Sequence, residues 1–448
     1  MAQSRNTIWL FLTATFLSQA LASIPTIKWQ NCSTSTPHPL DCENIQVPID
    51  WTDPESDQVT LRMVRHNATS PSKRLGSLIV NPGGPGSPAS TVVTYAPYAF
   101  GADILTHFDI IGLDPRGLRE PHRPSHRAPG LRVSIAMDIE AVRIALGDDK
   151  LTDLGLSYGT VLGAQYAQLF PGNIRAMALD GNVDHNMART YSLTPSSAAH
   201  ETGLIRFSQW CAQNSTCALH GTDVLQLFDD LVAQADETPL PAPVCAVSGI
   251  CRSDVTGEEL RDNLRNWLPF KDPPPQLLLT GWNDLAFTLA QAKSGNATLL
   301  STPLATDPAS ILFPELAIYC LDWSRDTSVA DVKYKQDNTA TLMPHTQGVC
   351  EVNIPQVQCI GWPVPVENRE HNASSNNTLP ILLVNVELDP LTPMEWVVGQ
   401  REQIRESVLL TRRGDGHTSY FLFGETSRAI DAYLVGLELP GENVVLDS

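Results

Sequence analysis

One serine between two glycines has the setting that most clearly indicates chemistry. Ser157 lies in "DLGLSYGTVLG", with Gly155 and Gly159 two positions away on either side. The apolar residues before it predict a strand and the small residues after it predict a helix. G-x-S-x-G at such a strand-to-helix turn is the pattern of a nucleophile elbow. We therefore interpret Ser157 as a nucleophile rather than as an ordinary polar residue at a turn.

A nucleophilic serine needs a general base, and the base needs an acid that orients it. Asp389 ends the predicted strand "PILLVNVELD", and His417 follows in the Gly-rich loop "RRGDGHTSY", after what we predict to be the last strand. One large class of serine hydrolases with this elbow has the chain order Ser, Asp, His. Asp415 is a rival acid, but it lies on the same predicted loop as His417, whereas a strand anchors Asp389. We predict a triad of Ser157, Asp389 and His417.

The same chemistry needs backbone N–H groups that stabilise a developing oxyanion. We expect one from Tyr158, the residue after the nucleophile, and one from Gly83 or Gly84 in the loop "NPGGPGSPA". Residues 84–89 also fit the dinucleotide fingerprint G-x-G-x-x-A. The prolines of the loop argue against that interpretation, because proline lacks the N–H that would bind a pyrophosphate. We expect no cofactor and no bound metal.

These side chains must be positioned by strands that end near one another. Continuous apolar runs that alternate with helix-like stretches predict a mostly parallel sheet covered on both faces, with functional groups past the carboxyl ends of its strands. The predicted helices are residues 134–147 and 159–170. The predicted strands are residues 76–81, 108–114, 151–157, 174–181, 380–389 and 406–411.

The chain of 448 residues is long for one such domain. The distance along the chain between Ser157 and Asp389 exceeds what two βαβ units need, since each takes about 30 residues. We predict a core formed by residues 23–184 and 376–448, and an inserted cap domain at residues 185–375, where the chain is rich in cysteine, tryptophan and proline.

The N-terminus predicts export. A basic residue, the apolar run of residues 8–22 and the sequence Ala20-Leu21-Ala22 have the organisation of a secretory signal peptide, which we place at residues 1–22. The run is shorter than the ~20 apolar residues that span a bilayer, so we expect a secreted protein that leaves the membrane once the signal is removed. Six N-x-[ST] sequons predict a glycosylated surface, at Asn31, Asn67, Asn214, Asn296, Asn372 and Asn376.

The nine cysteines agree with an exported chain, in which cysteines mostly form disulfides. Close spacing predicts the pairs Cys32–Cys42, Cys211–Cys217 and Cys245–Cys251. One of Cys320, Cys350 and Cys359 must remain unpaired, and spacing does not decide which.

Composition excludes one class of partner. The formal net charge is −19 with no basic patch, so we expect no nucleic acid to bind. The same numbers leave the oligomeric state open.

Several stretches together resemble a known family. These are "NPGGPGS", "FDIIGLDPRG", "LGLSYGTVLGAQYAQLFP", "IRAMALDG", "LLVNVELDPLTP", "GDGHTSY" and the late "CIGWP". They are similar to secreted α/β-hydrolases of the prolyl/tripeptidyl aminopeptidase type, which have a TAP-like C-terminal region. The resemblance implies an α/β-hydrolase fold and a serine exopeptidase that releases short N-terminal units from peptides. Residues 118–133 look shortened relative to that family.

The sequence therefore leaves two enzymatic functions as alternatives. The first is a secreted aminopeptidase-type serine peptidase. The second is an esterase or amidase that acts on a small molecule with the same triad, and a catalytically inactive binding protein is disfavoured because each triad and oxyanion element is present. An exopeptidase needs carboxylates that pair with a free α-ammonium group. The inserted segment offers Glu201, Asp229, Asp230 and Glu315 among other candidates.

Overall fold

The structure is a computed structural model of the chain. It describes residues 26–32, 38–53, 55–118, 131–277, 279–304, 312–366, 368–376 and 378–447. The predicted signal peptide and most of the shortened stretch at residues 118–133 lie outside these residues.

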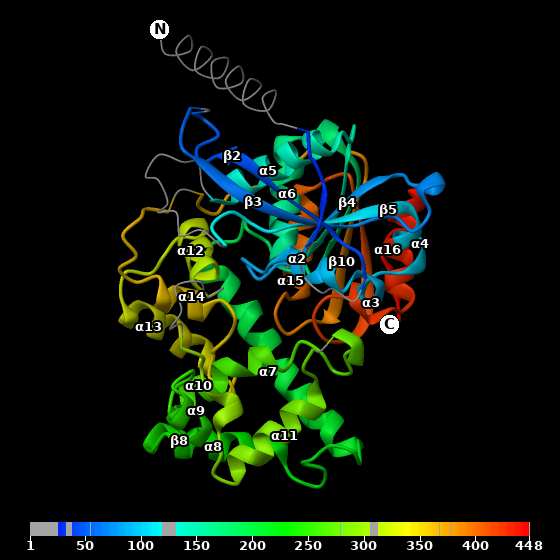
Figure 1. Cartoon of the computed structure of the whole chain (residues 1–448). Helices are drawn as coiled ribbons and strands as arrows, with labels where there is room; N and C mark the ends of the chain where they lie inside the picture. The colour runs from blue at the N-terminus through cyan, green and yellow to red at the C-terminus, as the bar shows by residue number, and fades with distance from the viewer. Residues whose placement is uncertain are drawn as a thin grey trace.

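A ten-stranded sheet forms the centre of the molecule (Figure 1), in the order β1-β2-β3-β5-β4-β6-β7-β10-β11-β12. The pairs from β1 to β5 are antiparallel, and the pairs from β5 to β12 are parallel. The strands are β1 (Gln30–Asn31), β2 (Asp41–Pro48), β3 (Gln58–His66), β4 (Gly76–Asn81), β5 (Phe108–Leu113), β6 (Leu151–Leu156), β7 (Ile174–Asp180), β10 (Ile381–Leu388), β11 (Ser407–Asp415) and β12 (Val444–Leu446).

The parallel strands are buried because helices cover both faces of the sheet. Alternate residues of β4 show this: Ile79 packs in the apolar cluster on one face, whereas Leu78 and Val80 pack in the cluster on the other. The first face is covered by α5 (Leu131–Leu146), α6 (Tyr158–Leu169) and α15 (Met394–Gln403). The second is covered by α2 (Ala89–Thr94), α3 (Ala96–Ala99), α4 (Ala102–His107) and α16 (Glu425–Gly436). A continuous apolar run therefore suits each central strand, as expected for a two-sided sheet.

Between β7 and β10 the chain leaves the sheet. It forms α7 (Arg189–Gln213), α8 (Val224–Glu237), β8 (Leu240–Pro241), α9 (Pro243–Ser248), β9 (Asp254–Val255), α10 (Gly257–Asn263), α11 (Trp282–Lys293), α12 (Leu312–Asp322), α13 (Val329–Ala340) and α14 (Asn353–Gln358). In Figure 1 the green helices α8, α10 and α11 gather below the sheet, with α7 leading to them. Buried side chains between Leu204 and Leu300 form an apolar cluster of their own. We call the chain between Asp180, the end of β7, and Ile381, the start of β10, the inserted segment.

Two expectations about the C-terminal part need correction. His417 does not follow the last strand, because β12 comes after it. The sixth predicted strand, residues 406–411, was placed too short, since β11 continues to Asp415. Pairing with β10 as far as Asp415 keeps this polar, glycine-containing end extended, and β12 pairs with β11 as far as Arg412.

The disulfide predictions are confirmed. The structure contains Cys32–Cys42, Cys211–Cys217 and Cys245–Cys251, and it resolves the remaining set as Cys320–Cys359 with Cys350 free and buried. The Cys320–Cys359 bond joins the end of α12 to the end of α14. None of the six sequon asparagines is buried. Among the described residues, no helix is both long and apolar enough to cross a membrane.

Candidate active site

The register of the sheet brings the predicted site residues to one edge. Asn81 of β4 pairs with Gly155 of β6, and Leu156 of β6 pairs with Asp180 of β7. Leu388 of β10 pairs with Asp415 of β11. The loop after β4, the elbow after β6 and the segments after β10 and β11 therefore emerge at the carboxyl edge of the same parallel strands.

Ser157 occupies a strained turn between β6 and α6. Its φ of 55° and ψ of −123° are uncommon for a residue other than glycine. The turn is held from both sides: the Ser157 N–H donates to the Asp180 carbonyl at 2.9 Å, and the Thr160 hydroxyl donates to the Ser157 carbonyl at 2.7 Å. The end of β4 passes so close that a Cβ on Gly159 would lie 2.5 Å from the Asn81 carbonyl oxygen. Only glycine fits at that position of the elbow.

His417 and Asp389 lie in direct contact. Nδ1 of His417 is 2.8 Å and 3.0 Å from the two carboxylate oxygens of Asp389. Burial lowers the pKa of His417, but the Asp389 carboxylate, together with Asp180 and Glu351, more than offsets this, so the pKa is raised above 6.5. Asp415, the rival acid, instead pairs with Arg206 at 2.7 Å.

Thr392 completes the setting of Asp389 and was not identified from the sequence. Its N–H and hydroxyl both donate to the Asp389 carboxylate, each at 2.8 Å, and the Leu391 N–H donates at 2.9 Å. The turn "LDPLTP" that follows the strand carries this signal, because an aspartate commonly accepts hydrogen bonds from backbone N–H groups two or three residues later.

Asp180 anchors the loop that carries His417 and was also missed. It is fully buried and accepts hydrogen bonds from the N–H groups of Ser419 and Tyr420, at 2.6 Å and 2.9 Å. Burial raises its pKa to about 6, although these hydrogen bonds oppose the shift. The signal is its place at the end of a buried strand, in "ALDG".

Ser157 and His417 each lie against the same turn, at Asp180 and Gly181. A Cβ on Gly181, the residue after Asp180, would lie 3.1 Å from Cε1 of His417, and the Ser157 N–H bonds to the Asp180 carbonyl. Between these described residues no hydrogen bond joins the Ser157 hydroxyl to the His417 ring. Such catalytic hydrogen bonds are often long before substrate binds.

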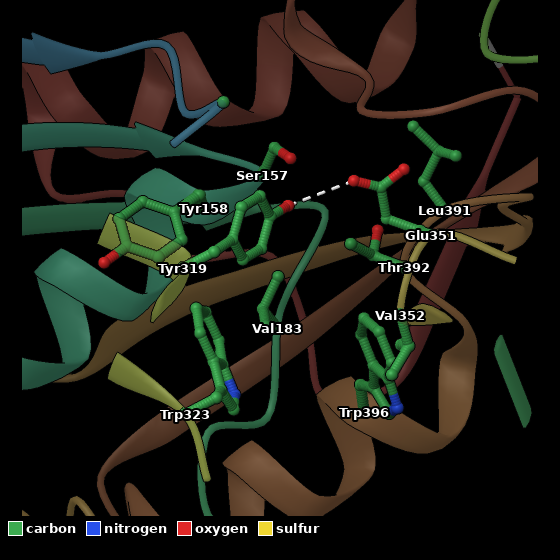
Figure 2. A pocket seen from close by; sticks show the side chains of 11 residues that line it. Ser157, Tyr158, Val183, Tyr319, Trp323, Glu351, Val352, Leu391, Thr392 and Trp396 are labelled. Carbon is green, nitrogen blue, oxygen red and sulfur yellow. Dashed lines mark hydrogen bonds between the residues drawn. The ribbon is translucent and has the colours of Figure 1, made fainter. Parts of the chain in front are cut away.

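A pocket opens beside Ser157 and has a volume of about 70 Å³. Figure 2 shows Ser157 and the carboxylate of Glu351 in the same cavity, with Trp323 and Trp396 on its far side. The lining residues come from both the sheet edge and the inserted segment: Gly84, Ser157, Tyr158, Val183, Tyr319, Trp323, Glu351, Val352, Leu391, Thr392 and Trp396.

The predicted oxyanion residues differ in their surroundings. Gly84 and Tyr158 line the pocket. The Gly83 N–H donates to the Asn81 side chain at 3.1 Å, so it is engaged elsewhere. Tyr158 is the first residue of α6, where unpaired N–H groups and the helix dipole favour negative charge.

Glu351 is the acid that sequence reasoning missed. It accepts a hydrogen bond from the Tyr319 hydroxyl at 3.0 Å (Figure 2), and an Arg265 nitrogen lies 3.5 Å from its carboxylate. Asp262 lies 3.5 Å from the same guanidinium, and burial raises the pKa of Asp262 to about 7. Glu315 also interacts electrostatically with Arg265. No local motif marks Glu351, because only the fold brings it to the pocket.

The other acids named from the sequence have structural partners. Glu201 accepts hydrogen bonds from the backbone of His345 and Thr346. Asp229 pairs with His345 at 2.9 Å, and Asp230 accepts a hydrogen bond from Gln226 on an exposed helix face. None of these three lines the pocket. The described residues also contain no cluster of three or more His, Cys, Asp or Glu side chains arranged to hold a metal ion.

Two family models match the chain. Residues 76–223 match the alpha/beta hydrolase fold model, and residues 350–445 match the model described as TAP-like protein. The first match contains the elbow, and the second contains Asp389 and His417.

Curated relatives match over most of their length. Serine protease Hip1 of Mycobacterium bovis is 27% identical over a gapped alignment of 478 positions, which covers 92% of this chain and 89% of that protein. Tripeptidyl aminopeptidase of Streptomyces coelicolor is 26% identical over an alignment of 470 positions, which covers 89% of this chain and 82% of that protein. Carboxylesterase B of Mycobacterium tuberculosis is 27% identical over an alignment of 483 positions, which covers 93% of this chain and 88% of that protein.

Proposed function

This chain is an α/β-hydrolase with a TAP-like C-terminal region, and from that premise we propose that it is a secreted serine peptidase that releases short units from the free N-terminus of peptides. The observation that most supports this proposal is that one pocket contains both the strained Ser157 and the carboxylate of Glu351. The first group attacks a carbonyl carbon, and the second recognises the end of the peptide.

The proposed chemistry follows from the contacts of His417. Its Nδ1 is held by Asp389, so Nε2 is left to take the proton from the Ser157 hydroxyl as the oxygen attacks the carbonyl carbon. The same ring then gives that proton to the leaving amine, and water repeats the sequence to release the acyl group. Asp389 holds the required tautomer and stabilises the imidazolium that forms.

The negative charge of the tetrahedral intermediate needs donors that are already in place. We assign this role to the N–H groups of Tyr158 and Gly84, since both residues line the pocket beside Ser157. Gly83 supports them by allowing the loop to approach the elbow. A Cβ at this position would lie 2.9 Å from Cβ of Ser157.

The charge around Glu351 favours a cationic group in the pocket. One guanidinium, that of Arg265, faces the carboxylates of Asp262, Glu315 and Glu351. Because the pKa of Asp262 is about 7, this residue is only partly ionised at neutral pH, but Glu315 and Glu351 together still outnumber the one guanidinium. The α-ammonium group of a peptide, charged below a pKa of about 8, supplies the missing cation when the peptide enters. An internal segment of a peptide has no such group, so this pairing distinguishes a chain end from a chain middle.

The inserted segment is the proposed cap. It contributes Tyr319, Trp323 and Glu351 to the pocket, while the sheet contributes the nucleophile. Two relatives are named as a serine protease and a tripeptidyl aminopeptidase, which supports peptide hydrolysis.

Matched peptides test the proposal. We expect hydrolysis of short peptide amides with a free N-terminus and no hydrolysis of the same peptides after N-acetylation. Ser157→Ala should lower the rate until only a roughly 10³–10⁴-fold enhancement over the reaction in water remains, which substrate binding and the oxyanion hole still provide. Glu351→Gln should raise KM for free peptides by at least about tenfold, since a hydrogen-bonded charge pair contributes ~1.5–3 kcal/mol.

Asp230→Asn is the control for Glu351→Gln, because it removes an exposed acid of the same inserted segment away from the pocket. It should leave KM unchanged. Equal hydrolysis of free and acetylated peptides would remove the exopeptidase proposal.

A small-molecule esterase or amidase is the second candidate. It is favoured by the apolar wall of the pocket, formed by Val183, Trp323 and Trp396, and by the relative named carboxylesterase B. Rapid cleavage of short acyl esters by an enzyme that leaves all peptides intact would establish it in place of the peptidase.

A further inference from the structure

A buried carboxylate of the inserted segment contacts the nucleophile elbow from behind. Asp322, the last residue of α12, has no exposed surface, and its carboxylate accepts a hydrogen bond from the Tyr158 hydroxyl. Its backbone carbonyl lies 2.6 Å from Nε2 of His185. Trp323, the next residue, packs against Tyr158, with 5.9 Å between the centroids of the two rings. The end of α12 is thus held against the first residue after Ser157.

The charge of Asp322 is balanced within the same interior. Arg132, on α5, is 1% exposed and attracts the Asp322 carboxylate electrostatically. Burial raises the pKa of Asp322 to about 6, whereas Arg132 and the Tyr158 hydroxyl act in the opposite direction. A buried carboxylate is costly unless it is paired and hydrogen-bonded, so Asp322 depends on Arg132 for a compensating charge and on the Tyr158 hydroxyl for a hydrogen bond.

Tyr158 connects this buried contact to the proposed oxyanion hole. Its N–H is the proposed oxyanion donor, and it directly follows the strained backbone of Ser157. Strained conformations persist only where the surroundings over-determine them. An oxyanion donor must also lie within about 2.7–3.1 Å of the oxygen it stabilises, so a small movement of this residue is costly.

We propose that Asp322, together with Arg132, is a positioning residue that fixes Tyr158 through its hydroxyl and thereby sets the oxyanion hole. This inference rests on the proposed function of Ser157 and Tyr158. Helix α12 also carries Tyr319, whose hydroxyl donates to Glu351 at 3.0 Å. One helix of the inserted segment therefore connects the residue that recognises the peptide end to the residue that stabilises the intermediate.

The test separates positioning from simple stability. Tyr158→Phe and Asp322→Ala should each lower kcat by about tenfold or more and leave KM within about threefold. Both changes remove the hydrogen bond between the Tyr158 hydroxyl and Asp322, and so displace an N–H group that stabilises the transition state rather than the bound substrate. A substrate-matched peptide aldehyde, which mimics the tetrahedral intermediate, should bind more weakly by the same factor, while the cleaved peptide product binds as before. The double variant should be no slower than the slower single variant, because the two changes remove one interaction.

Tyr166→Phe is the matched control. Tyr166 lies on the same helix α6, is also buried, and donates a hydrogen bond from its hydroxyl to another carboxylate, that of Glu140, at 2.6 Å. This change should lower stability without changing kcat. Asp322→Asn keeps the side-chain volume and an acceptor for the Tyr158 hydroxyl, so its kcat should lie closer to that of the wild type than the kcat of Asp322→Ala. If Asp322→Ala does not fold, Tyr158→Phe and Asp322→Asn are compared instead.

The outcomes distinguish this inference from the proposed function. Absence of wild-type hydrolysis, with no labelling of Ser157 by a fluorophosphonate, would overturn the proposed function itself. An active wild type with unchanged kcat in Tyr158→Phe and Asp322→Ala would overturn only the positioning role. So would an equal loss of kcat in Tyr166→Phe, because stability of α6 would then explain the effect.

Discussion

The protonation of one buried ring controls the proposed reaction at the residue scale. His417 can accept a proton only when neutral, and its raised pKa results from a balance in which Asp389, with Asp180 and Glu351, outweighs burial. Asp389 itself is held by Thr392 and by backbone N–H groups, so its carboxylate stays directed at Nδ1.

The pH dependence of kcat/KM follows from this balance. Activity should fall as pH falls through a midpoint above 6.5, because protonation of His417 removes the base. Asp389→Asn removes the interaction that raises the pKa, so the midpoint should move to lower pH. The remaining rate should be lower by roughly 10⁴, since the tautomer is no longer held.

Asp415→Asn is the control for this experiment. It changes the neighbouring acid, which pairs with Arg206 instead of His417, and should leave the midpoint in place. A midpoint that moves in Asp415→Asn but not in Asp389→Asn would exchange the proposed roles of the two acids.

At the scale of elements, the site depends on how closely a loop and a turn approach each other. The loop after β4 passes over the elbow between β6 and α6, and Gly83 lies in close contact with it. It has a φ of +93°, and a Cβ there would lie 2.5 Å from the Leu156 carbonyl oxygen. Both the backbone conformation and the space require glycine.

Gly83→Ala should therefore lower kcat by at least about tenfold, because the loop must move away from the proposed oxyanion donors. Gly147→Ala is the matched control: Gly147 has a φ of +78°, but a Cβ there meets nothing within 4 Å. Both variants should lose about 1–2 kcal/mol of stability from the left-handed backbone. Denaturant unfolding and steady-state kinetics of the two variants measure this difference, and equal kcat values would contradict it.

The disulfide between α12 and α14 has a similar structural role. It closes a loop with a sequence separation of 39, whereas Cys211–Cys217 closes one of 6. In the chain-entropy description these loops correspond to about 4 and about 2 kcal/mol of stability.

Replacing both Cys320 and Cys359 with serine should therefore destabilise the protein more than replacing Cys211 and Cys217. Only the first change should also lower kcat, because α12 carries Asp322 and Tyr319. Unfolding in denaturant and kinetics on the folded protein give the two readouts. Equal kcat in the two double variants would show that the α12 bond does not support the site.

At the scale of the whole molecule, the chain has features of an exported enzyme. Four disulfides cross-link the chain, one near the N-terminus and three within the inserted segment, and Cys350 alone of the nine cysteines is free. We propose that the signal segment is removed and that the exposed sequons receive glycans.

Material from a secreting host should therefore begin at Ser23 and carry N-glycans. Intact mass before and after glycan removal measures both. A thiol reagent should modify one cysteine, and only after denaturation, because Cys350 is 1% exposed. A chain that retains Met1 and has nine reactive thiols would contradict the proposed export.

Some features were predictable because their signals are local. The apolar runs of β4 to β7 and β10 are buried on both faces, and such strands read as continuous apolar segments. The elbow was predictable because a sharp turn at Ser157 requires small neighbours. The close cysteine pairs were predictable for the same local reason.

Other features depended on which distant segments meet. Strands β2 and β3 were not predicted, because they pair antiparallel beside the edge strand β1 and alternate polar with apolar residues, whereas the prediction rested on continuous apolar runs. The partner of Cys320 was undetermined between two cysteines until the fold placed Cys359 beside it.

The sequence by itself determined the fold class and the set of residues proposed for the triad, since each has a signature in its own strand and turn. The tertiary structure alone decided that Glu351 lies beside Ser157, that Asp415 pairs with Arg206, and that Asp322 contacts Tyr158. The physical reason is the sequence separation of these contacts. A carboxylate carries the same chemistry wherever it lies in the chain, and only packing of the inserted segment against the sheet determines which positive charge, hydroxyl or cavity it meets.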